Sequence, residues 1–133
     1  MRRSIFILVT LLVCCFSAKA QISTILEADS SSVLYLLRVA GGQEDQDSVR
    51  LYLEEAFNQS RQLDFATGSI LALQGLSLLE QQERNLSAAL RYALQELSYL
   101  DPQLNPQLYF DALIRIGSIY QDENLDNKAK EYY

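Results

Sequence analysis

Residues 112–133, ALIRIGSIYQDENLDNKAKEYY, decide how the rest of the chain is interpreted. Two stretches with helical spacing flank a polar turn, which predicts two helices joined by a short connection. Ile116 and Tyr120 are spaced to fill the seam between these helices. Gly117 lets the second helix approach closely, and Ala129 is small where the two helices cross. The segment therefore predicts a tightly packed helix pair.

The same segment resembles a tetratricopeptide repeat. It fits the pattern W-x2-L-G-x2-Y followed by A-x3-F, with Leu in the Trp position and Tyr in the Phe position. The resemblance implies an all-α fold in which antiparallel helix pairs stack as a tetratricopeptide-like right-handed solenoid, with an incomplete last repeat. The residues that it assigns to packing between helices are Leu71, Gly75, Leu78, Ala89, Leu113, Ile116, Gly117, Tyr120, Ala129 and Tyr133.

An earlier, weaker copy of the pattern has Gly75 in the place of Gly117. The distance between these glycines along the chain exceeds the roughly 34 residues of a minimal repeat. Gly75 and Ala89 are also two residues farther apart than Gly117 and Ala129. We therefore expect a longer turn within the earlier repeat.

The first twenty residues have the pattern of a secretory signal peptide. Arg2 and Arg3 precede an apolar run at residues 5–16, and an A-x-A pattern follows at residues 18–20. We predict cleavage after Ala20 and export across the inner membrane, to the periplasm or the exterior. Two alternatives are an uncleaved N-terminal anchor helix and a lipoprotein signal.

Cys14 would be the lipidated residue, and the only other cysteine is its neighbour Cys15. The mature chain would then have no thiol, no disulfide and no thiolate metal ligand. Loss of three basic residues with the signal leaves 8 against 17 acids, a formal charge of 8 − 17 = −9. Such a chain lacks the basic stripe that nucleic acids require, and it would be repelled by an anionic membrane.

Polar turns divide the rest of the chain. Residues 21–46 are expected to form an N-terminal segment with a short helix that Gly41 and Gly42 end, and residues 47–133 to form the repeats. Asp29 or Ser30 should cap the first helix. The later helices are expected at residues 47–64 with Asp47 or Ser48 as cap, after residue 64, at residues 86–100, from Pro106 with Asn105 as cap, and from about residue 127 to residue 133.

The residue types argue against catalysis. The chain contains no histidine, and its carboxylate pairs, such as Glu54 with Glu55, have the pattern of solvated helix faces. Gly41–Gly42 lacks the context of a phosphate-binding loop, and residues 122–126 lack the glycine of a calcium loop. We therefore predict no enzyme, no metal and no cofactor in this stretch, although catalysis in a segment beyond Tyr133 stays open.

Protein or peptide binding is the predicted function. The resemblance places the binding groove on Ala72, Leu76, Leu79, Asp111, Ile114, Ser118 and Gln121. The acidic balance favours a peptide or helix with apolar anchors and basic flanks, no nucleic acid, and membrane contact only through the signal or a downstream segment. Similar exported arrays form the sensor end of bacterial signal-transduction proteins, so this chain is interpreted as part of one. The alternative is a small secreted helical bundle that acts alone as a carrier or inhibitor.

Overall fold

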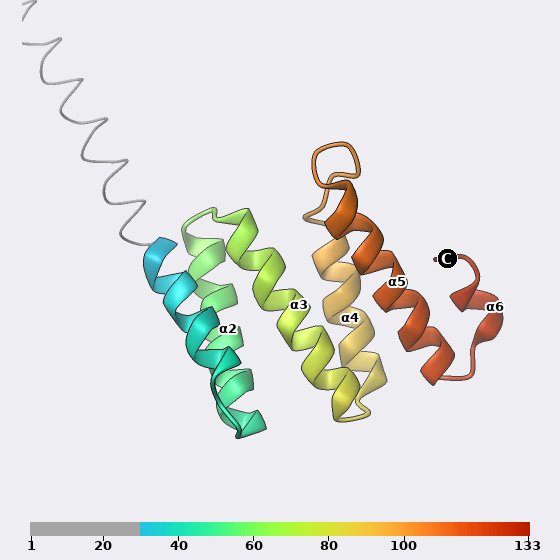
Figure 1. Cartoon of the computed structure of the whole chain (residues 1–133), viewed down its shortest axis with the longest axis horizontal. Helices are drawn as coiled ribbons and strands as arrows, with labels where there is room; N and C mark the ends of the chain where they lie inside the picture. The colour runs from blue at the N-terminus through green and yellow to red at the C-terminus, as the bar shows by residue number, and fades with distance from the viewer. Residues whose placement is uncertain (1–29) are drawn as a thin grey trace, which may run out of the picture.

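A computed structural model describes residues 30–133 of the 133-residue chain, without the side chains of residues 126 and 127 (Figure 1). The predicted signal peptide, both cysteines and the predicted cap Asp29 lie outside the described residues. Helices account for the regular structure of this range, and no strand occurs in it. The predicted all-α class is confirmed.

The helices fall close to the predicted boundaries. Residues 30–41 form the first described helix. It is followed by α2 (Gln46–Gln62), α3 (Ala66–Gln82), α4 (Leu86–Leu97), α5 (Pro106–Asp122) and α6 (Asp126–Ala129). Within residues 30–133, no helix is both long and apolar enough to span a membrane.

Two helix ends differ from prediction. The cap of α2 is Asp45, neither Asp47 nor Ser48, because the Asp45 carboxylate accepts hydrogen bonds from the Ser48 N–H at 3.0 Å and hydroxyl at 2.6 Å. Helix α6 has four residues, whereas it was expected to reach residue 133. The last residues instead turn back on α5, where the Tyr133 hydroxyl donates to Gln121 Oε1 at 2.8 Å.

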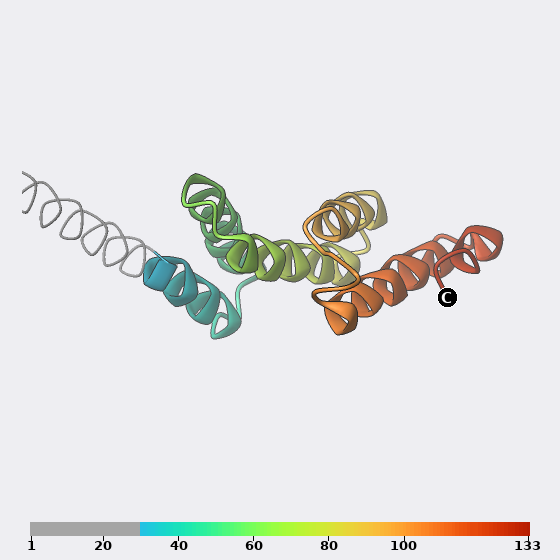
Figure 2. The same ribbon diagram turned by 90° about the horizontal axis from the view of Figure 1, so that it is seen from above.

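The helices alternate between two layers. Helix 30–41, α3 and α5 lie in one layer, and α2 and α4 lie in the other (Figure 2). Each helix from α2 to α6 packs mainly against its neighbours in sequence. The buried apolar residues accordingly form small clusters along the chain, such as Val33 with Ala56 and Ala72 near one end and Ala89 with Ile116 near the other.

The helix pairs recur at a constant offset along the chain. Helices α3 and α5 both have 17 residues, and they begin at Ala66 and Pro106. Helices α2 and α4 begin at Gln46 and Leu86, which are separated by the same distance in sequence. We call this common separation the repeat offset. It relates α3 to α5 residue by residue, and it relates the first twelve residues of α2 to those of α4.

The turns that close α3 and α5 are equivalent under the repeat offset. Both contain a residue with a positive φ angle, Arg84 (64°) in the first turn and Asn124 (60°) in the second. The residue that follows each of these donates its N–H to the carbonyl oxygen five residues earlier, Asn85 to Glu80 and Leu125 to Tyr120. These bonds close the helix as in a Schellman motif. The repetition therefore extends from the helices to the backbone of the turns.

The repeat offset corrects the alignment of Gly75 with Gly117. The residue equivalent to Gly117 is Ser77, which is buried and donates from Oγ to the Ala89 carbonyl at 3.0 Å. Both residues are small where the following segment approaches, since a Cβ at Gly117 would lie 2.9 Å from the Tyr133 ring. The expected longer turn does not occur.

Candidate partner-binding face and groove

The partner-binding residues predicted on α3 are buried. Ala72, Leu76 and Leu79 have exposed fractions of 0, 1 and 6%. Ala72 packs in a cluster with Val33 and Ala56, residues of helix 30–41 and α2. Ala72 and Leu76 therefore face the interior and not a partner, because a shift of two residues turns a helix by about 200°. Leu79 lines the groove described below.

The partner-binding residues predicted on α5 lie at its surface. Ile114 is 55% exposed, Asp111 and Gln121 are exposed, and Ser118 is half-buried. Their equivalents on α3, one repeat offset earlier, are also exposed or half-buried, and Leu71 and Leu78 among them are 39% and 43% exposed. We name this set the α3–α5 face: Leu71, Gln74, Leu78, Gln81, Asp111, Ile114, Ser118 and Gln121.

Some of the packing residues predicted from the resemblance are exposed, and the others are buried or half-buried. Leu71 and Leu78 belong to the α3–α5 face, which corrects their assignment to packing, and Gly75 is half-buried against Leu53. Tyr133 is 63% exposed, with its ring against Gly117. The others are buried or half-buried as expected: Ala89, Leu113, Ile116, Gly117, Tyr120 and Ala129.

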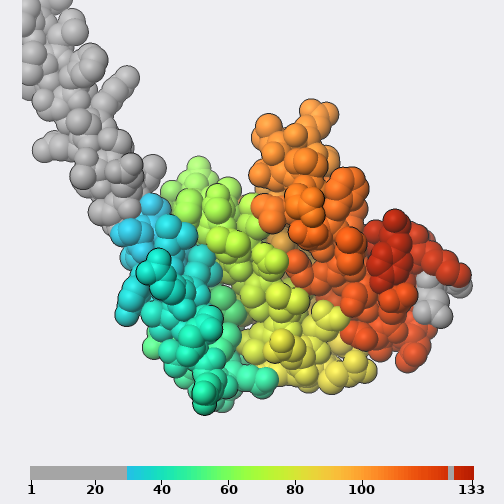
Figure 3. Space-filling model, viewed as in Figure 1, coloured from blue at the N-terminus to red at the C-terminus, as the bar shows by residue number. Residues whose placement is uncertain are grey.

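A polar bridge joins the two helices of this face. Gln81 Nε2 donates to Ser118 Oγ at 3.1 Å and to Asp122 Oδ2 at 2.8 Å. The bridge fixes α3 beside α5 near their C-terminal ends. The space-filling view shows helix 30–41 in blue, α3 in green to yellow and α5 in orange following one another across the molecule (Figure 3).

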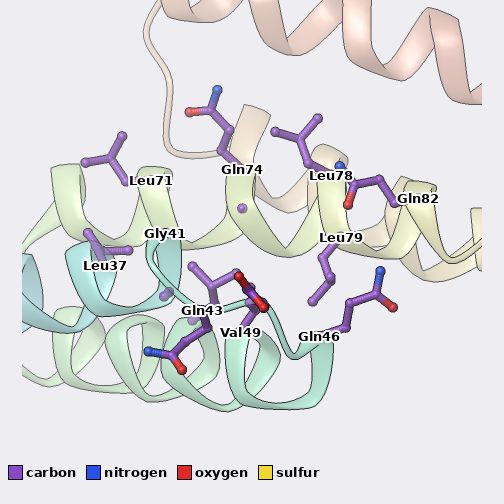
Figure 4. A pocket seen from close by; sticks show the side chains of 14 residues that line it. Leu37, Gly41, Gln43, Gln46, Val49, Leu71, Gln74, Leu78, Leu79 and Gln82 are labelled. Carbon is purple, nitrogen blue, oxygen red and sulfur yellow. The ribbon is translucent and has the colours of Figure 1, made fainter.

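A groove of about 640 Å³ lies between helix 30–41 and α3 (Figure 4). Its residues come from the end of helix 30–41, the loop after it, the start of α2 and most of α3. They are Leu37, Ala40, Gly41, Gln43, Glu44, Gln46, Val49, Leu53, Leu71, Gln74, Gly75, Leu78, Leu79 and Gln82. The predicted site missed its helix 30–41 and α2 side entirely.

Small residues keep the groove open. Ala40 and Gly41 line it at the end of helix 30–41, and Gly75 lines it on α3. One repeat offset later, the equivalent positions carry Glu80, Gln81 and Arg115, all of which have long polar side chains. One sequence signal for the groove was therefore Gly41, which the sequence pattern assigned only to ending the helix.

The groove is apolar inside and amide-rich at its edge. Gln43, Gln46, Gln74 and Gln82 line it, and Glu44 is its one charged lining residue. In residues 30–133, the side chains of these four glutamines make no hydrogen bond to other protein groups. Their amide groups are therefore available to a bound segment.

The acidic residues around the groove differ in their roles. Asp45 is occupied as the α2 cap, and its hydrogen bonds from Ser48 lower the pKa of its carboxyl. Glu80 is buried and forms an ion pair with Arg50, which also pairs with Glu83. In the described part of the chain, Glu44 makes no ion pair.

A second charged site lies inside the α4–α5 contact. Glu96 and Arg115 form an ion pair with side-chain exposures of 1% and 8%. Burial raises the pKa of Glu96, while Arg115 lowers it.

No group of three or more potential metal ligands occurs in the part of the chain that the structure describes. The groove thus offers binding groups and no acid-base pair.

No protein-family model, no curated protein and no solved structure matches this chain. Function is therefore inferred from the residues and their geometry.

Proposed function

We propose that this chain is an exported scaffold that binds a protein or peptide segment through the groove and the adjoining α3–α5 face. The groove carries the proposal, because it is an open apolar space of about 640 Å³ that small side chains leave unfilled. Leu71 and Leu78 lie on its border and are 39% and 43% exposed. Apolar anchors of a partner would remove these leucines from water.

The arrangement of helices supports a tetratricopeptide-like solenoid over a closed bundle. Helix pairs recur at the repeat offset, and each helix packs on its neighbours in sequence. A closed carrier bundle would gather its apolar residues into one core. The separate clusters along the chain favour the open array.

Charge favours a partner with basic flanks. The predicted mature chain has a formal charge of −9, from 8 basic and 17 acidic residues, and Glu44 lines the groove. Helix α3 carries no lysine or arginine, and the one arginine of α5 is Arg115, which is buried against Glu96. Basic residues of a partner would therefore meet carboxylates and no free cation on these two helices. Export and a role as the sensor end of a larger signalling protein rest on residues 1–20 and the repeat resemblance.

Site-specific photocrosslinking in the native host tests the binding proposal. A photoreactive residue at Leu78 samples the groove border, and one at Leu51 samples a 65% exposed position on α2 in the other layer. We expect a discrete protein adduct from position 78 and none from position 51. Equal labelling from both positions, or no adduct from 78, would contradict the proposal.

A further inference from the structure

We propose that the groove binds its partner as an extended segment of about five residues. Apolar side chains enter the groove, the segment's backbone bonds to the glutamine amides at the edge, and a lysine or arginine lies beside Glu44. This inference rests on the proposed binding function. It adds the conformation and the charge of the bound segment.

The length of the groove sets the number of residues in an extended segment. Its lining on α3 runs from Leu71 to Gln82, which corresponds to about 16 Å along a helix. An extended chain covers this length with about five residues.

The chemistry of the edge favours an extended segment. Each glutamine amide offers two N–H donors and one carbonyl acceptor. A bound helix has satisfied its own backbone groups, but an extended segment presents unpaired N–H and C=O groups. Gln82 on α3 and Gln43 and Gln46 on the opposite side can bond to them. The Gln74 amide is directed away from helix 30–41 (Figure 4).

Carboxylates at the loop end of the groove favour a basic residue at that end of the bound segment. Glu44 lines the groove, and exposed Asp47 follows in the first turn of α2. The nearest arginine of α2, Arg50, is engaged by Glu80 and Glu83. A basic residue would therefore meet free carboxylates at the loop end of the groove. Arg38 is exposed on helix 30–41 and does not line the groove.

Two glycines provide a matched pair of variants. A Cβ at Gly41 meets nothing within 4 Å, and Gly41 lines the groove, so Gly41→Leu adds side-chain volume to the groove. Gly42 does not line the groove, and a Cβ there makes only an ordinary contact of 3.6 Å with the Val39 carbonyl oxygen. Neither glycine has a positive φ. Gly42→Leu is therefore the control.

The test measures binding of labelled peptides to the full chain by fluorescence anisotropy at low salt. The probe is Lys-Leu-Ser-Leu-Ser-Leu-Lys, and the comparison peptides are its glutamate-flanked form and a stapled helix of the same composition. We expect the probe to bind at least tenfold more tightly than either comparison peptide. Gly41→Leu should raise its Kd at least tenfold, and Gly42→Leu less than twofold.

Each other outcome is decisive. Tighter binding of the stapled helix, again blocked by Gly41→Leu, would overturn the extended segment and leave the proposed function standing. Equal binding of the glutamate-flanked peptide would overturn the proposal that a basic residue of the bound segment lies beside Glu44. No binding of any of the three peptides would overturn the inference, and the crosslinking at position 78 would then judge the proposed function separately.

Discussion

The α2–α3 and α4–α5 contacts occupy equivalent places in the repeat and are packed in opposite ways. In the first, Gly75 on α3 leaves room for Leu53 on α2, since a Cβ at Gly75 would lie 2.8 Å from Leu53 Cδ2. Ala56 and Ala72 are completely buried beside them. At these positions the contact is apolar, with the large residue on α2 and the small one on α3. Farther along the same contact, Arg50 on α2 pairs with buried Glu80 on α3.

In the second contact the large residue has changed sides. Arg115 on α5 stands where α3 has Gly75, and Ala93 on α4 stands where α2 has Leu53. Glu96 takes the place of Ala56 and pairs with Arg115 in the interior. One helix geometry therefore accepts either apolar packing or a buried ion pair. The groove lies beside the first contact, where Gly75 lines it.

Loss of one partner from the ion pair should have the largest effect. Arg115→Met leaves the Glu96 carboxylate buried without its cation, which we expect to lower the free energy of unfolding by about 3–5 kcal/mol. Chemical denaturation measures the change. Arg91→Met on exposed α4 surface is the control, and a similar loss in both variants would contradict a special role for the pair.

Replacement of both partners should reverse that loss. Glu96→Leu combined with Arg115→Met makes these positions apolar, as the equivalent Ala56 and Gly75 are in the first contact. Removal of two buried charges is often neutral or stabilising by about 1–4 kcal/mol, so the double variant should unfold at or above the wild-type denaturant midpoint. A double variant no more stable than Arg115→Met would show that the contact depends on charge, in contrast to α2–α3.

Sequence patterns predicted the helices well and the faces of one helix wrongly. The spacing of apolar residues and the turn residues located every helix, because burial and turn chemistry act over a few neighbouring residues. Alignment through Gly75 and Gly117 failed because the position needs a small residue and not glycine itself, and Ser77 meets that need. The groove depends on three small residues in two helices, a combination visible only once the helices are placed.

Enlargement of a glycine in the first contact should have an intermediate effect. A Cβ at Gly68 would lie 2.3 Å from Ser60 Oγ, 2.6 Å from Phe65 Cδ1 and 2.8 Å from Val33 Cγ1. Because three side chains would have to move, we expect Gly68→Ala to cost about 1–3 kcal/mol.

The equivalent position in α5 is occupied by Leu108, which is half-buried, so the two contacts differ here as well. Gly42→Ala, with only an ordinary contact, is the control for the intrinsic effect of glycine replacement. Thermal unfolding of both variants separates the effects, and an equally small shift for both would show that the first contact is looser than its distances indicate.

The pH dependence of stability should show the smallest difference between the contacts, because two influences on Glu96 oppose each other. Burial raises the pKa of Glu96 above its usual 4.5, nearby Asp111 acts in the same direction, and Arg115 lowers it. The folded chain therefore binds this proton more tightly than the unfolded chain does. Its contribution to stability is complete below pH 4.5 and is lost as the pH rises through the higher folded pKa.

Glu96→Gln removes this titration and keeps a group that can bond to Arg115. The free energy of unfolding of the wild type minus that of Glu96→Gln should fall as the pH rises from about 4.5. Urea denaturation at a series of pH values measures this difference. A difference that rises with pH would mean that attraction to Arg115 outweighs burial, and the α4–α5 contact would then be held by its charges where α2–α3 is held by close packing.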